Sequence, residues 1–100
     1  MKEIKDIVKQ IREELEAAER YAKAAAKIKE VRSTDSSTYA DMARQELGHV
    51  DSLHNMAVRM IEKEKALDQQ VPPAMQAVWD WEHEQMIDRV ARIKSLLSMA

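Results

Sequence analysis

The chain lacks cysteine and contains little glycine, proline or aromatic side chain. Its 100 residues include no Cys, one Gly, two Pro, two Trp, two Tyr and no Phe. The absence of Cys excludes disulfides and thiolate metal sites. Sparse aromatics, and β-branched residues without alternating runs, make β-strands unexpected. With so few Gly and Pro residues, little interrupts a long helix.

The chain also lacks an excess of one charge and any long apolar run. Its 16 basic and 18 acidic residues give a net charge of −2, and the two signs are interleaved, so no basic patch favours nucleic-acid binding. No segment resembles a signal peptide or is long enough to span a bilayer. We therefore expect a cytoplasmic protein without membrane contact, although such a chain could also be packaged in a particle.

Apolar residues recur every seven positions over three long segments, which is typical of helix faces. We expect an all-α fold of three long antiparallel helices, at about residues 2–32, 37–68 and 73–98, forming one bundle domain over residues 1–100. The expected rows of the first helix are Ile4, Ile11, Ala18 and Ala25, flanked by Ile7, Glu14, Tyr21 and Ile28. Those of the second are Tyr39, Glu46, Leu53, Met60 and Leu67, beside Ala43, Val50 and Ala57. The third stripe is Met75, Trp79, Glu82, Met86, Val90, Ile93 and Leu97.

Two short segments mark the expected connections. The segment STDSST, residues 33–38, is rich in residues that begin helices, and Thr38 and Asp41 have the spacing of a capping box. Pro73 suits the first turn of the third helix. If the first connection is centred on Ser36, Glu14 lies considerably further from it along the chain than His49 does. This comparison places the two side chains at different heights along the hairpin.

The second helix carries an E-x-x-H motif, Glu46 and His49. Residues three apart lie on one face of a helix, so both side chains can reach one metal ion. The motif also arises by chance on charged helices. Gly48 between them costs about 1 kcal/mol relative to Ala. A close approach by a neighbouring helix or side chain would explain that cost.

Each expected helix places one Glu in its apolar stripe: Glu14, Glu46 and Glu82. Carboxylates that converge in a core repel one another and lose solvation, and a metal ion removes both penalties. Carboxylate oxygens with a neutral imidazole suit iron, or manganese. Each Glu alone also fits a helix edge that turns to solvent, and Tyr21 fits ordinary packing with an outward hydroxyl.

The segment ELEAAERYAKAA and the E-x-x-H motif resemble the ferritin-like superfamily, which includes bacterioferritins, rubrerythrins and encapsulated ferritins. Glu14, Ala17 and Tyr21 match the spacing on the first ligand helix of that superfamily. The resemblance extends from the N-terminus to about Lys65. It implies that Glu14 and His49 are terminal iron ligands and Glu46 a bridging one, with Tyr21 orienting a carboxylate.

The third helix departs from this pattern. Glu82 matches the ferritin-like Glu, but Gln85 stands where a His would complete a second E-x-x-H, and a fourth helix is missing. The resemblance therefore implies a homodimer, or a higher homo-oligomer, in which two chains complete a di-iron site. Two alternatives stay open: one metal held by Glu14, Glu46, His49 and Glu82 of a single chain, or a decayed site.

Two functions follow from these alternatives. The first is a ferritin-like protein that binds iron and oxidises Fe(II) with dioxygen or peroxide, the carboxylates stabilising Fe(III). The second is a non-enzymatic structural or interaction bundle of bacterial or phage origin. The missing fourth helix and Gln85 favour the second function, and the Glu and His positions favour the first.

Overall fold

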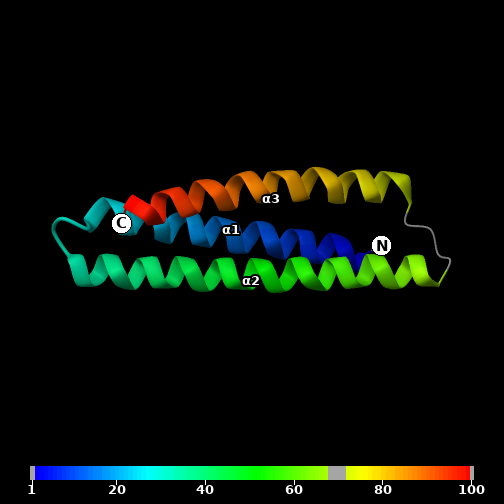
Figure 1. The fold of residues 1–100 in the computed structure, drawn as a ribbon, viewed down its shortest axis with the longest axis horizontal. Helices are drawn as coiled ribbons and strands as arrows, with labels where there is room; N and C mark the ends of the chain where they lie inside the picture. Colours follow the sequence, from blue (N-terminus) through cyan, green and yellow to red (C-terminus); the bar gives the residue numbers. More distant parts are fainter. Residues whose placement is uncertain (1, 68–71, 100) are drawn as a thin grey trace.

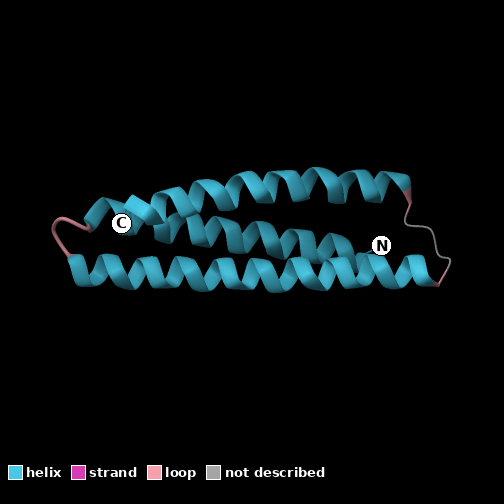
Figure 2. Ribbon diagram, in the orientation of Figure 1, coloured by secondary structure: helices cyan, strands magenta, loops and turns pink. Residues whose placement is uncertain are grey.

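The computed structural model describes residues 2–67 and 72–99, and these residues form three α-helices and no strand. The helices are α1 (Lys2–Ile28), α2 (Ser33–Ala66) and α3 (Pro73–Met99). They form a rod of 56 × 17 × 17 Å in which α2 runs antiparallel to α1 and α3 (Figures 1 and 2). The predicted all-α fold with three long helices is confirmed.

Helix α1 is the central element and packs against both other helices (Figure 1). Its predicted core row is buried throughout, and Ile7 of the flanking row is buried too. A third row, which the heptad analysis missed, is also buried: Val8, Leu15 and Ala22. Ala18, Ala22 and Ala25 have no exposed surface, and their small side chains allow the backbones of α1 and its neighbours to approach closely. Burial on two sides of α1 follows from its having two neighbours.

Helix α2 buries Ala43, Val50 and Ala57 as predicted, whereas the predicted row that begins at Tyr39 is not fully buried. Its buried residues are Ser36, Ala40, Ala43, Val50, Ala57 and Ile61. Of the predicted outer row, Tyr39 is 36% exposed and Leu67 59%, whereas Glu46, Leu53 and Met60 are half-buried. The row that begins at Tyr39 therefore forms a flank of α2 beside the core.

The connection between α1 and α2 occupies residues 29–32 and lies earlier than predicted. The predicted capping box is wrong, because Thr38 lies inside α2 and its Oγ1 donates to the Thr34 carbonyl at 3.1 Å. Ser36, expected at the centre of the turn, is instead buried, and its Oγ donates to the Ala25 carbonyl at 2.7 Å. Because the Ser36 hydroxyl bonds to a carbonyl of α1, it does not compete for the backbone of its own segment. The polar segment can therefore continue the helix instead of forming a cap or turn.

Helix α3 covers one side of the hairpin. Its buried residues Met75, Trp79, Ile93 and Leu97 belong to the predicted stripe, and the start at Pro73 is confirmed. His54 of α2 stacks on Trp79 and His83 of α3, with ring centroids 5.7 and 4.9 Å apart. The predicted end of the second helix at Asp68, and the following residues 69–71, lie outside the described residues. None of the described helical residues form an apolar stretch long enough to cross a membrane.

Candidate metal centre

Glu14 of α1 meets Glu46 and His49 of α2 on one flank of the hairpin. The His49 Nδ1 atom lies 3.5 Å from Glu14 Oε2 and 3.5 Å from Glu46 Oε2. One donor atom from each of the three residues lies within 4.8 Å of the other two. Side chains that are distant in sequence are thus brought to one point, at the spacing from which a single cation can be held.

The early connection explains why these heights match. Glu14 lies almost as far before Ile28, the last residue of α1, as Glu46 lies after Ser33, the first of α2. The two carboxylates therefore stand at nearly equal distances from the turn. The mismatch expected from a turn centred on Ser36 disappears, because the turn occupies residues 29–32 and ends before that serine.

The site is open to solvent on one side. The side chains of Glu14 and Glu46 are 31% and 23% exposed, and that of His49 is 60% exposed. The expectation that these carboxylates lie in a closed apolar seam is therefore met only in part. On α1, Arg12 and Glu19 form ion pairs with α3 and so mark the side of the helix that faces it. By helical spacing, Glu14 lies on the opposite side of α1. The site thus opens on the face of the hairpin that α3 does not cover.

No Lys or Arg in the described part of the chain forms an ion pair with either carboxylate. Among the described residues, His49 is the one basic side chain that forms an ion pair with Glu14 or Glu46. When the His49 imidazole is neutral, the Glu14 and Glu46 carboxylates lie half-buried side by side, and no positive charge of the described residues pairs with them. Such a pair attracts a positive ion, and two carboxylates with one imidazole form a donor set that suits iron or manganese. Three protein ligands leave coordination positions open for a further ligand.

Tyr21 lies on the same flank of α1 as Glu14, two helical turns further along. Its ring stacks on that of Tyr39 of α2, with centroids 6.2 Å apart and an interplanar angle of 25°. Within the described part of the chain, the Tyr21 hydroxyl makes no hydrogen bond with Glu14, Glu46 or His49. Its predicted role in orienting a ligand therefore stays a prediction.

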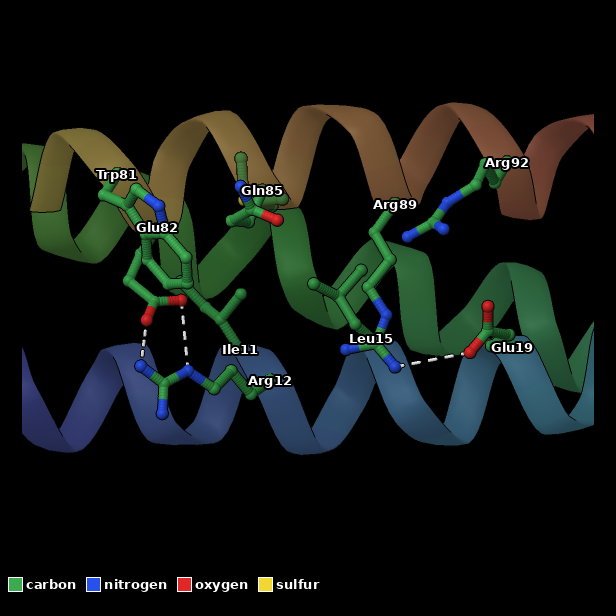
Figure 3. A pocket seen from close by; sticks show the side chains of 10 residues that line it. Ile11, Arg12, Leu15, Glu19, Trp81, Glu82, Gln85, Arg89 and Arg92 are labelled. Atoms are coloured by element: carbon green, nitrogen blue, oxygen red, sulfur yellow. Dashed lines mark hydrogen bonds and ion pairs between the residues drawn. The ribbon is translucent and has the colours of Figure 1, made fainter.

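The structure does not bring Glu82 to this site. Its side chain is 10% exposed, and both carboxylate oxygens accept hydrogen bonds from the Arg12 guanidinium, the Nε bond being 3.0 Å long (Figure 3). Arg12 lies on the α3 side of α1, away from Glu14. The hypothesis of one ion held by four ligands of a single chain is thus not supported by this geometry. Periodicity missed the pairing, since the two residues lie on different helices and are 70 positions apart.

The neighbours of Glu82 are also accounted for. His83 stacks on His54 and Trp79, and Gln85 lines the groove between α1 and α3 (Figure 3). His83 does not belong to the group formed by Glu14, Glu46 and His49, and the groove that Gln85 lines contains none of these three residues. Helix α3 therefore contributes packing and two ion pairs with α1, Arg12–Glu82 and Glu19–Arg89, whereas the candidate ligands come from the hairpin.

Gly48 occupies an open position on α2. A Cβ built there meets no atom within 4 Å among residues 2–67 and 72–99, so the expected close approach is not found in this part of the chain. The residue is exposed on α2, turned away from the core. The glycine therefore lowers helix stability without a steric reason within the described residues.

We expect Gly48→Ala to raise the free energy of unfolding by about 1 kcal/mol, because alanine restricts the unfolded chain and fits an open helix position. Urea denaturation followed by circular dichroism measures this change. Metal content should stay the same, because Gly48 points away from the flank that holds Glu46 and His49. A lower stability in the variant would show that a neighbour outside this chain approaches Gly48.

Comparisons with known proteins give no family assignment: no protein-family model, curated protein or solved structure matches the chain.

Proposed function

We propose that this protein binds iron through Glu14, Glu46 and His49, and that two chains meet across this flank to build a di-metal centre that oxidises Fe(II). The observation that carries the proposal is the meeting of two carboxylates from different helices within 4.8 Å, with an imidazole as their one ion-pair partner among the described residues. An added cation removes the repulsion between them. The same set of ligand atoms also suits manganese.

The surroundings of the site support a second chain there. The flank is open and carries partly buried or exposed apolar side chains on both helices: Tyr21, Ile28, Tyr39, Met42, Leu53, Met56 and Met60. A second copy related by a two-fold axis would add the same three ligands and cover these side chains. A di-iron carboxylate site in a helical bundle uses two such sets, each a Glu and an E-x-x-H.

The residues of the site have distinct tasks in the proposed reaction. Iron is the substrate, and each Fe(II) gives one electron to dioxygen or peroxide. The Glu14 and Glu46 carboxylates, being hard anionic donors, favour the Fe(III) product over Fe(II). His49 holds the ion from the exposed side of α2. Its Nε2 atom makes no hydrogen bond with the described residues, so it can bond water or a partner chain. Tyr21 remains a proposed positioning residue for a ligand carboxylate, and a cytoplasmic location remains a prediction.

The test is the metal content of the purified chain. Protein incubated with Fe(II) without oxygen and then desalted is analysed for iron per chain, and its mass is measured by native mass spectrometry. We expect stoichiometric iron in the natural sequence, and in Glu46→Ala we expect both the loss of iron and a smaller assembly, because the interface at the metal centre is lost. Two controls should keep the metal: Glu62→Ala, which removes an exposed carboxylate of the same helix, and Glu82→Gln, which removes the carboxylate held by Arg12.

The outcomes separate the proposal from its alternative. The alternative is a structural or interaction bundle without metal, and the Arg12–Glu82 pair favours it, because it occupies the carboxylate of the third helix. Absence of iron in the natural sequence, or equal iron in Glu46→Ala, would overturn metal binding by these residues. Iron bound without oxidation when dioxygen is added would leave a binding protein that is not an enzyme.

A further inference from the structure

A second uncovered surface lies on α3, beside its groove with α1. Eight of its residues repeat at alternating steps of four and three positions, the spacing of a helix–helix seam, and all of them are exposed. We call this row the α3 seam: Ala74, Val78, Trp81, Gln85, Asp88, Arg92, Ser95 and Met99. Trp81, Gln85 and Arg92 lie in sequence along one side of α3 (Figure 3).

The α3 seam exposes large apolar side chains that no described element of the chain covers. Trp81 is 58% exposed, Met99 53% and Val78 44%. Arg89 and Arg12 of the adjoining groove pair with Glu19 and Glu82, whereas Arg92 forms no ion pair within the described residues (Figure 3). An exposed indole and an unpaired guanidinium on one helix face indicate a surface that contacts a partner.

We propose that the α3 seam pairs with the same seam of a second copy, antiparallel and related by a two-fold axis near Met86 and Ile87. In that register Trp81 faces Arg92, so the guanidinium of each chain lies on the indole of the other. Gln85 faces Asp88, so an amide donates to a carboxylate. The ends pair in the same way, Val78 with Ser95 and Ala74 with Met99. Each contact occurs twice, because the interface is isologous.

The charges of the seam select this orientation. A parallel pair of α3 helices would set Asp88 against Asp88 and Arg92 against Arg92, and like charges in contact are unfavourable. The antiparallel pair separates the two Arg92 side chains by about 16 Å along the helix axes. It also gives each charged side chain a polar or aromatic partner directly opposite. The self-complementary sequence therefore identifies the occupant as a second copy of this chain.

This interface is distinct from the proposed metal-binding dimer. The α3 seam lies on α3, whereas Glu14, Glu46 and His49 lie on the flank of the hairpin away from α3. It requires no metal. Two different two-fold interfaces on one chain link dimers into larger assemblies, closed or open. With both interfaces formed, the mass in solution exceeds that of a dimer.

Disulfide trapping tests the register, since the natural chain has no cysteine and any introduced thiol is unique. Val78→Cys and Ser95→Cys are made separately, each combined with Glu46→Ala, mixed in EDTA and oxidised with diamide. We expect the mixed disulfide between the two variants to exceed either homodisulfide by about tenfold, because only antiparallel pairing opposes these positions. Ala91→Cys, exposed on another face of α3, is the control and should not cross-link.

A charge swap gives a second, reversible readout. Trp81→Arg sets a second guanidinium against Arg92, and we expect it to weaken dimerisation about tenfold or more, since both cation–π contacts are replaced by repulsion. Adding Arg92→Trp to this variant restores the pair in exchanged positions and should restore the dimer. Sedimentation over a concentration series in EDTA measures this, and circular dichroism confirms that each variant folds.

Several results would overturn the proposal. These are excess homodisulfides, cross-linking of Ala91→Cys as strong as that of the seam, no rescue in the double variant, or a monomer at every concentration. None of these results bears on iron content, which is measured separately. Loss of metal binding with an intact Val78–Ser95 cross-link would remove the proposed function and leave the α3 seam as the interface.

Discussion

Metal ion is expected to raise the melting temperature of this chain by roughly 10–20 °C. An ion that binds only the folded chain, at 100 times its dissociation constant, adds about 2.7 kcal/mol of stability. For a domain of this size each kcal/mol corresponds to about 4–8 °C. Glu14, Glu46 and His49 come together only when α1 and α2 are paired, so unfolding disperses the ligands. Calorimetry with Mn(II), which is stable to air, and with anaerobic Fe(II) measures the shift.

Glu14→Gln should remove this metal-dependent shift and, without metal, make the chain equally or slightly more stable. The sign follows from the site when the His49 imidazole is neutral: without a bound cation Glu14 repels Glu46, and the amide removes that repulsion while keeping the size of the side chain. Glu13→Gln, an exposed neighbour on α1, is the matched control and should keep the full shift. An equal rise of melting temperature in the Glu14→Gln variant would place the metal elsewhere.

Trp79→Ala is expected to lower the free energy of unfolding by about 3–5 kcal/mol. The indole is 8% exposed and is the largest side chain by which α3 docks on the hairpin. It also stacks with His54 of α2 and His83 of α3, at centroid distances of 5.7 and 6.0 Å. The truncation leaves a cavity at this junction and removes the stacking. Urea denaturation, followed by helical circular dichroism, measures the loss.

Ile87→Ala is the control for this experiment. Ile87 is another large apolar residue of α3 but is 53% exposed and lies outside the α3 seam, so its truncation should change stability by no more than about 0.5 kcal/mol. A loss in Trp79→Ala no larger than that in Ile87→Ala would show that α3 contributes little to the folded state. A biphasic transition in Trp79→Ala would show instead that α3 separates before the hairpin unfolds.

The helices and most of their buried faces could be predicted from periodicity. The row from Ile4 to Ala25 and the residues Trp79, Ile93 and Leu97 are buried as expected, because a repeat of apolar residues over a long helix leaves one face that must be removed from water. The pair Glu46 and His49 was equally accessible to sequence reasoning, since both lie on one helix and their spacing fixes their relation.

The predicted position of the first connection is wrong because residues 33–38 suit both a turn and a continuing helix. Ser and Thr favour turns and caps, but they also continue a helix when a hydroxyl finds a partner. The partner of Ser36 is the Ala25 carbonyl, which belongs to the other helix of the hairpin. No pattern in the local sequence predicts this contact between two helices. The early connection that accompanies it sets the register in which Glu14 lies beside Glu46 and His49.

The amino-acid sequence by itself determined that the chain is helical, where the apolar faces lie and which side chains offer metal-binding atoms, because these properties depend on neighbours within one or two helical turns. Only the tertiary structure decided which of the three glutamates meet. The α1–α2 hairpin brings two of them to an imidazole, and Arg12 holds Glu82 on the other side of α1. Those pairings depend on the rotation and register of whole helices, which many weak packing contacts set together.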